Sequence, residues 1–134
     1  MKKRYWITFI LIVFIQLVNA QDKRDNTITA HGFIPYSRIA EILKKEGFSN
    51  TNNDTLFIVA EGKPMIAISD LTYIIKRTDT TLVIKGFLVP KGEKNYFNGM
   101  PLDFSFGYFK KGFLIMIETC KLFGLPLSYS KEKH

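Results

Sequence analysis

The side chains in this sequence that are best suited to catalysis are His31, Asp103 and Cys120. Together they could provide a general base, a general acid and a nucleophile, as in a small hydrolase. Their surroundings in the sequence do not favour this use, because no histidine or asparagine lies beside Cys120 to activate its thiolate and no second metal ligand lies beside His31. We expect Cys120 to be a small buried hydrophobic residue, with intermolecular pairing or a reactive thiol as the alternatives.

The sequence motifs that usually mark an enzyme are missing. There is no Gly-rich loop between a strand and a helix, no histidine pair at metal-binding spacing and no nucleophile elbow. Asp70 is expected at the start of a turn and Asp103 on the solvent face of a strand, whereas acid–base catalysis requires a shifted pKa and a partner in a cleft. The sequence therefore predicts a protein that is not an enzyme, with no catalytic, cofactor-binding or metal-binding residue and no cofactor.

The segment 90–101 is the candidate binding loop. It is longer than a hairpin requires, and it sets aromatic residues and a methionine among lysines, asparagines and glycines. Aromatic side chains at the tip of a loop are common binding anchors. We name Lys94, Tyr96, Phe97 and Met100 as the candidate binding residues. In the alternative, Tyr96 and Phe97 fold back as a lid over the open end of a sheet.

One amphipathic helix is expected between Pro35 and Gly47. Pro35 ends the preceding extended segment, Ser37 can cap the helix with its hydroxyl group, and Gly47 supplies the left-handed residue that ends it. Between them runs an apolar stripe with charged neighbours. The stripe consists of Ile39, Ala40, Ile42 and Leu43. This helix should bury one face and expose the other.

The rest of the chain has the pattern of strands joined by tight turns. Short apolar runs flank turn-forming residues at three places, which predicts three hairpins. The predicted pairs are Leu56–Ala60 with Met65–Ser69, Leu71–Lys76 with Leu82–Val89, and Leu102–Tyr108 with Phe113–Thr119. The segment 27–34 adds an edge strand, and 49–54 forms a loop. The predicted fold class is α+β: one N-terminal helix followed by an antiparallel meander of about six strands.

Several of the predicted strands are apolar on both faces, as in the runs 56–59 and 114–117. An open sheet covered by one short helix cannot bury both faces, so a second cover is required. The sheet could curl or close into a barrel, associate with another copy of the chain, or enclose an apolar ligand. Curling or closure is favoured, because small barrels fill themselves with side chains.

Residues 1–20 have the pattern of a cleavable signal peptide. Three basic residues precede an apolar run that ends in Val18-Asn19-Ala20, so cleavage is expected after Ala20. The run is shorter than the ~20 apolar residues that a membrane-spanning helix needs. The only cysteine, Cys120, is far from the cleavage region, so no lipid anchor is expected there. The mature protein is expected to be periplasmic or secreted, with no stable membrane anchor.

Removal of residues 1–20 from the 134-residue chain leaves 114 residues, which is the size of one domain. We expect a single α+β domain over 21–134, with a flexible lead-in over 21–27 and a flexible tail over 128–134. The leader holds three of the basic residues, so the formal net charge falls from +7 to +4. The remaining lysines are scattered, and this argues against nucleic acid as a partner.

These features predict a small exported binding or interaction module of the bacterial cell envelope. Its partner is expected to be another protein or a small apolar ligand, and self-association into a homo-oligomer is an open alternative. Two other functions are kept as alternatives: the small periplasmic hydrolase, and a structural subunit that joins its partners by strand addition at a free sheet edge.

Overall fold

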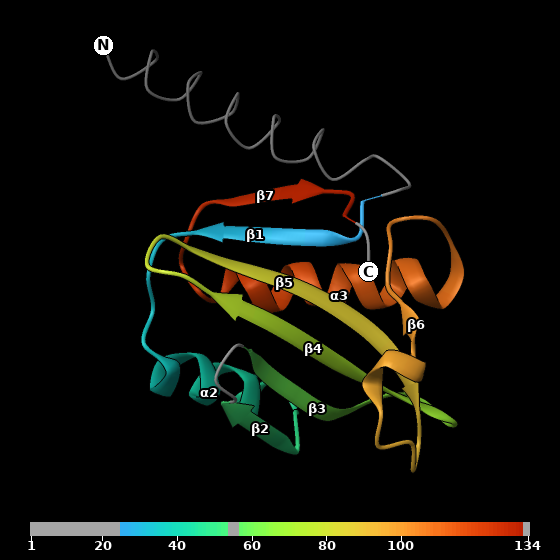
Figure 1. The fold of residues 1–134 in the computed structure, drawn as a ribbon. Helices are drawn as coiled ribbons and strands as arrows, with labels where there is room; N and C mark the ends of the chain where they lie inside the picture. The colour runs from blue at the N-terminus through green and yellow to red at the C-terminus, as the bar shows by residue number, and fades with distance from the viewer. Residues whose placement is uncertain (1–24, 54–56, 133–134) are drawn as a thin grey trace.

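A computed structural model of the chain describes residues 25–53 and 57–132 (Figure 1). The predicted signal peptide and its cleavage site lie outside the described residues. Within those residues, no helix has the length and hydropathy that crossing a membrane requires.

Over the described residues, the fold is mixed α+β, with a seven-stranded antiparallel sheet and two α-helices. The strand order is β2-β3-β4-β5-β1-β7, and the short strand β6 pairs with β5. The strands are β1 (Thr27–His31), β2 (Asn50–Asn53), β3 (Ile58–Ile66), β4 (Ser69–Arg77), β5 (Thr81–Pro90), β6 (Met100–Pro101) and β7 (Leu127–Ser130). The helices are α2 (Tyr36–Lys45), α3 (Gly107–Lys121) and the single 3-10 turn η1 (Tyr96–Asn98).

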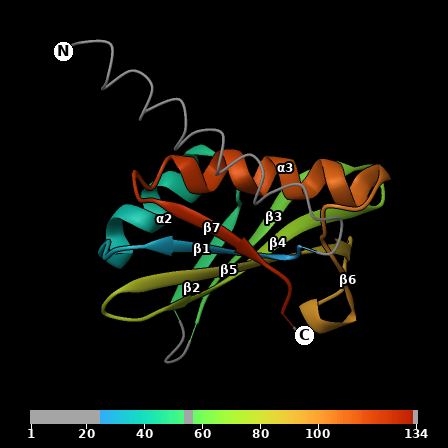
Figure 2. The same cartoon turned by 90° about the horizontal axis from the view of Figure 1, so that it is seen from above.

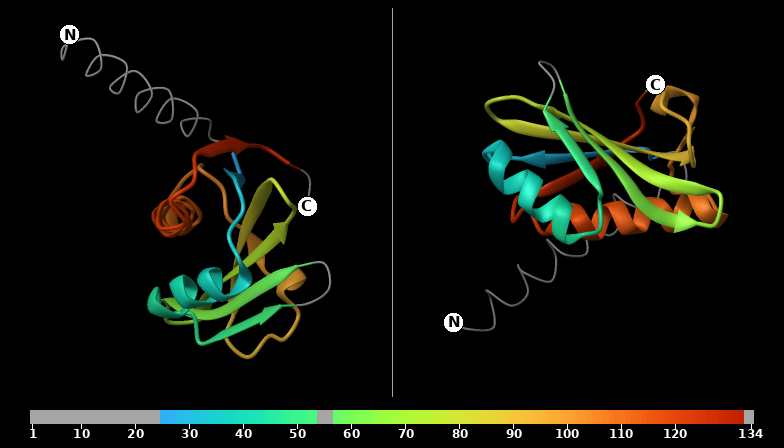
Figure 3. Two further views of the ribbon diagram at one scale, coloured as in Figure 1. Left: turned by 90° about the vertical axis from the view of Figure 1, so that its left-hand side faces the viewer. Right: turned by 90° about the horizontal axis from the view of Figure 1, so that it is seen from below.

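The sheet is open, and the predicted barrel closure is wrong. β2 and β7 end the strand order on opposite sides and do not pair with each other. Both helices lie on the same side of the sheet, as the views from above and from the side show (Figures 2 and 3). Two helices, rather than closure, therefore cover the apolar face.

Helix α2 lies between Pro35 and Gly47, where the sequence places a helix. Pro35 is the residue before the first helical turn and has an extended backbone, but no side chain caps the helix, and Ser37 lies inside it. At the other end, Gly47 has φ of 102°, and the Phe48 amide donates to the carbonyl of Leu43 at 3.1 Å. This is the αL ending that glycine permits without steric cost. The buried residues of the helix are Ile39, Ile42 and Leu43.

The first predicted hairpin is wrong in its turn. β3 continues through residues 61–64, and the chain reverses at Ala67 and Ile68 instead. The register between β3 and β4 shifts twice, between Ala60 and Lys63 and again between Pro64 and Ile66. Gly62 and Pro64 were interpreted as turn residues, and both are also typical of a β-bulge. The second predicted hairpin is present as β4 and β5, joined at 78–80.

The third predicted hairpin is wrong, because residues 107–121 form α3. Its buried residues fall on one helical face, and Phe113, Met116, Ile117 and Cys120 recur at spacings of three, one and three. Gly112, taken as a turn residue, lies in the helix where it crosses the sheet. A Cβ at Gly112 would be 2.6 Å from Cδ2 of Leu102, so the glycine permits this close approach. Asp103 is therefore not on a strand but in the loop before α3.

Two smaller expectations about the strands are also wrong, and residues of both segments expected to be flexible are hydrogen-bonded. β1 is not an edge strand, because it pairs with β5 on one side and β7 on the other. Residues 50–53 form the edge strand β2 rather than a loop. The segment 128–130, expected in a flexible tail, is paired with β1, and Asn26 of the expected lead-in is buried and bonded to the backbone of Glu132 at 2.8 and 2.9 Å.

The two-sided burial of the strands has a local explanation. In β5, Leu88 belongs to the core under the helices, whereas its neighbours Phe87 and Val89 face the other side and are nevertheless buried. The loop between β5 and β6 lies over that side, since a Cβ at Gly99 would be 2.9 Å from Cγ2 of Val89. The helices cover one face of the sheet, and the loop covers part of the other.

Candidate binding cleft

A polar cleft of about 160 Å³ lies between the loop 91–96 and the strands β2, β3 and β4. It is smaller than the ~300–1,000 Å³ pockets that enclose drug-sized ligands. Most of its lining is polar: Ser49, Asn50, Glu61, Asp70, Thr72, Glu93, Lys94 and Tyr96 line it together with Gly62, Val89, Pro90 and Gly92. The cleft therefore fits one small polar group and not an apolar ligand.

Carboxylates dominate the charge of the cleft. Glu61, Asp70 and Glu93 contribute three negative charges and Lys94 one positive charge, so the lining is locally acidic on a chain whose formal net charge is +7. A concave site with one sign of charge concentrates ligands of the opposite sign. The cleft should favour cations and hydrogen-bond donors over anions.

Asp70 is the most informative residue of the cleft. It is the second residue of β4 and pairs with Val89 across the ladder. Its Oδ1 atom is buried and accepts no hydrogen bond from the described part of the chain. The atom forms a loose ion pair with the Lys91 ammonium group, whose Nζ lies 3.9 Å away, outside hydrogen-bonding distance. A buried carboxylate oxygen that lacks a hydrogen-bond donor costs free energy. This atom can therefore accept a hydrogen bond from a ligand or from water.

The loop that forms the other wall is held by its own hydrogen bonds. The Glu93 amide donates to the carbonyl of Pro90 at 3.0 Å, and the Asn95 amide donates to Oε1 of Glu93 at 3.0 Å. The Lys91 amide donates to the carbonyl of Ile68 at 2.9 Å, which ties the loop to the turn between β3 and β4. These bonds fix the wall before any ligand binds.

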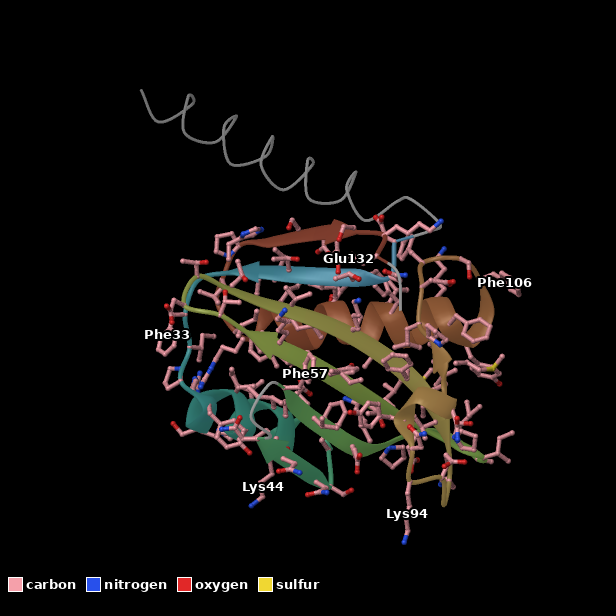
Figure 4. The ribbon with its side chains drawn as sticks, viewed as in Figure 1. Phe33, Lys44, Phe57, Lys94, Phe106 and Glu132 are labelled. Carbon is pink, nitrogen blue, oxygen red and sulfur yellow. The ribbon has the colours of Figure 1, made fainter. Side chains whose placement is uncertain are left out.

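The structure brings together two of the four predicted binding residues. Tyr96 is half-buried in η1 and lines the cleft, and Lys94 lines it from an exposed position (Figure 4). Met100 lies in β6 and is 59% exposed, outside the cleft. The side chain of Phe97 lies outside the described residues. Tyr96 therefore lines a cleft, and both the binding role and the lid role stay predictions.

Sequence reasoning missed the strand side of the cleft. Asp70 and Thr72 are two residues apart in β4, so their side chains share the face that the helices do not cover. That alternation of polar residues was the available signal. Glu61 and Gly62 reach the cleft from β3 only because the strand continues through the predicted turn.

His31, Asp103 and Cys120 do not line the cleft, and His31 and Asp103 lie far apart. The amide of Phe104, next to Asp103, donates to the carbonyl of Asp25 before β1, whereas His31 ends that strand. At about 3.3 Å per strand residue, the distance along the chain from Asp25 to His31 is roughly 20 Å, so Asp103 lies at the opposite end of β1 from His31. His31 is engaged with Oγ of Ser128 at 2.8 Å.

Cys120 is buried, as the sequence predicts. It is 1% exposed, and burial raises the pKa of its thiol above the usual 9.0. A thiol held in its protonated form is a weak nucleophile and a poor metal ligand.

A second concavity of about 260 Å³ lies on the helix side, between α3 and the β3 region. Leu114 and Ile115 provide its apolar surface, and Lys63, Lys111, Glu46 and Glu118 surround them with balanced charge. Among the described residues that line this concavity, every buried side-chain polar atom has a hydrogen-bond partner. The cleft around Asp70 differs in this respect.

Comparisons with known proteins do not assign the chain to a group, because no family model, curated protein or solved structure matches it. Within residues 25–53 and 57–132, no group of three or more histidine, cysteine, aspartate or glutamate side chains is placed to hold a metal ion. The cleft geometry is therefore the main guide to function.

Proposed function

We propose that this chain is an exported, non-catalytic binding module of the bacterial cell envelope, periplasmic or secreted, and that the cleft around Asp70 is its binding site. The ligand class that suits the cleft is a small polar molecule or group that carries a protonated amine and hydroxyl groups. This replaces the small apolar ligand expected from the sequence alone.

The observation that carries the proposal is the buried Oδ1 atom of Asp70, which accepts no hydrogen bond from the described residues. A ligand ammonium group could donate to it, and hydrogen bonds to a charged partner are worth about 1.5–3 kcal/mol. The hydroxyl group of Thr72 and the side chains of Ser49 and Asn50 supply further polar partners around the same space. A wall that is already hydrogen-bonded lowers the entropic cost of binding.

The export part of the proposal rests on residues 1–20. Their pattern of charges, apolar run and Val18-Asn19-Ala20 ending is that of a secretory signal. The non-catalytic part is supported by the separation of His31 from Asp103 and by the buried, protonated state of Cys120. A small hydrolase remains the less supported alternative.

The test uses glucosamine, in slightly acidic buffer where its amine is protonated, with glucose as the neutral probe. Amide shifts in the ¹H–¹⁵N spectrum report binding. We expect glucosamine to shift the amides of Thr72 and Gly92, and glucose to shift them less. Asp70→Asn keeps the side-chain shape and should weaken glucosamine binding by about tenfold or more.

Asp79→Asn is the matched control, because Asp79 is exposed in the turn at the far end of the same strand. It should bind glucosamine as the wild type does. The proposal fails if glucosamine leaves the cleft amides unshifted, or if Asp70→Asn binds it with unchanged affinity.

A second candidate function, assembly by strand addition, is favoured by the edges of the sheet. β7 pairs with β1 along one side only, and its four residues are neither fully buried nor fully exposed. An unpaired edge can receive a strand from another chain. Size-exclusion chromatography of the purified protein separates the two proposals, since a stable oligomer supports the subunit and a clean monomer counts against it.

A further inference from the structure

The described surface concentrates its exposed apolar side chains at one end. Seven large hydrophobic residues are exposed, and four of them belong to segments at the end where α3 begins. Ile68 lies in the turn between β3 and β4, Met100 in β6, and Phe106 and Tyr108 flank the start of α3. These segments lie at the same end of the molecule in Figures 1 and 2. We call these four residues the aromatic end.

The aromatic end projects outward and is anchored to the core. Phe106 is 72% exposed and is labelled at the outer limit of the molecule (Figure 4). Its ring meets that of Phe109 edge to face, with centroids 6.4 Å apart, and the neighbouring pair Phe104 and Phe113 is 6.0 Å apart. Phe113 is fully buried. The ring of Phe106 therefore has one aromatic neighbour at the surface, next to a second aromatic pair that reaches the core.

The chain conformation leaves two neighbouring aromatic residues exposed at this point. Gly107 has φ of 61°, in the left-handed region that other residues rarely adopt. It separates Phe106 from Tyr108, which is 55% exposed. The glycine allows the chain to enter α3 while both neighbours stay at the surface.

The charge beside these rings is positive, and Lys111 also borders the concavity that Glu46 and Glu118 line. Lys110 and Lys111 are exposed in the first turns of α3, and neither forms an ion pair with another described residue. Lys110 lies over the ring of Phe104, with its Nζ 5.0 Å from the ring centroid. The nearby carboxylate of Asp103 is occupied by the amide and hydroxyl groups of Ser105. The N-terminal end of the helix dipole adds to the positive potential.

We propose that the aromatic end docks on an anionic lipid surface. Tyr108 enters the headgroup region, where amphipathic aromatic rings are favoured, and Phe106 buries its apolar ring at the boundary with the acyl chains. Lys110 and Lys111 are attracted to the lipid phosphates. The charge complementarity and the convex, projecting shape favour a bilayer surface as the occupant. This goes beyond ligand binding in the cleft and depends on none of the cleft residues.

The test is co-sedimentation with vesicles of phosphatidylglycerol and phosphatidylcholine in equal parts, compared with vesicles of phosphatidylcholine alone. The protein is used as producing cells release it, with its N-terminus determined by mass spectrometry. A retained leader would raise the vesicle binding of every variant. The contribution of the aromatic end is therefore measured by the difference between variants. Wild type should bind the anionic vesicles more strongly, and added salt should weaken the binding.

Two double variants separate the parts of the surface. Lys110→Ala with Lys111→Ala should lower partitioning roughly fivefold for each lysine removed, which corresponds to about 1 kcal/mol each. Phe106→Ala with Tyr108→Ala should lower it by at least about tenfold. The control is Leu122→Ala, which removes a side chain that is 49% exposed just past the other end of α3 and should leave partitioning unchanged.

Melting temperatures of all variants check that the fold is intact. If the aromatic double variant does not fold, Phe106→Ser alone replaces it. Equal binding to the two kinds of vesicle overturns the proposal. So does an equal loss in Leu122→Ala and the aromatic double variant, or the absence of wild-type binding to anionic vesicles.

Discussion

Alkaline pH should destabilise this protein through Cys120. The thiol is 1% exposed, and burial raises its pKa above the usual 9.0, so the folded protein keeps it protonated. In the unfolded chain the thiol loses its proton near pH 9. Above that pH the unfolded state binds fewer protons than the folded state, and the free energy of unfolding therefore falls as pH rises.

The magnitude follows from linkage. One group that ionises only in the unfolded state lowers the free energy of unfolding by about 1.4 kcal/mol for each pH unit above its unfolded pKa. From pH 9 to about pH 11, Cys120 alone should cost roughly 3 kcal/mol. Burial also raises the pKa of Tyr73 above its usual 10.0, and a contact with the Thr119 hydroxyl offsets only part of that rise. Tyr73 should add to the loss only above about pH 10.

The assay is urea denaturation at a series of pH values for wild type and Cys120→Ala. The substitution removes packing and shifts the whole stability curve by a constant amount, but it also removes the thiol titration. The slope of stability against pH should therefore be shallower in Cys120→Ala by about one proton above pH 9. Parallel slopes for the two proteins would show that the thiol is not held protonated by the fold.

Three further outcomes are expected. Gly86→Ala should lower stability by about 1–3 kcal/mol in urea denaturation, because its Cβ would be 2.6 Å from Cδ1 of Leu102; an unchanged midpoint would mean that the core has room. Asn26→Ala should speed amide exchange across β7, because the Asn26 side chain both donates to and accepts from the Glu132 backbone; protection equal to wild type would contradict this. Intact mass of the exported protein should place its N-terminus directly after Ala20, and a chain still carrying Met1 would refute the signal peptide.

The elements predicted correctly are those with local signals. α2 is fixed by Pro35 before it, Gly47 after it and an apolar stripe between them, all within one short segment. The hairpin of β4 and β5 likewise depends on a turn at 78–80, where Thr78 Oγ accepts the amide of Thr81 at 3.0 Å. Neither element needs information from distant parts of the chain.

The failures share a physical cause, because each involves a residue whose role depends on distant contacts. Gly112 was interpreted as a turn residue, but it is helical and permits α3 to approach Leu102. Alternation at 102–108 resembled a strand, although Leu102 alone of this run is fully buried. The register of β3 shifts next to Gly62 and Pro64, and the strand does not end there. Close approach and register are properties of the packed sheet, and single-sequence patterns do not contain them.

The sequence predicted only the loop side of the candidate site, for the same reason. The length and composition of the loop identified Lys94 and Tyr96, which are local features. Asp70 joined the site through the pairing of β4 with β5, which sets it opposite Val89 beside the start of the loop. The sequence places Asp70 in a turn, whereas the register of β4 with β5 places it in the wall of the cleft.

The connection from β5 to β6 links the two proposed surfaces, which can still be tested separately. The segment between β5 and β6 forms a wall of the cleft through Glu93 to Tyr96 and then supplies Met100 to the aromatic end. Asp70→Asn changes the cleft without altering an exposed apolar side chain, whereas the substitutions at Phe106 and Tyr108 leave every cleft residue in place. A variant that loses glucosamine binding but keeps vesicle binding would therefore test only the proposal about the cleft. The reverse result would concern only the aromatic end.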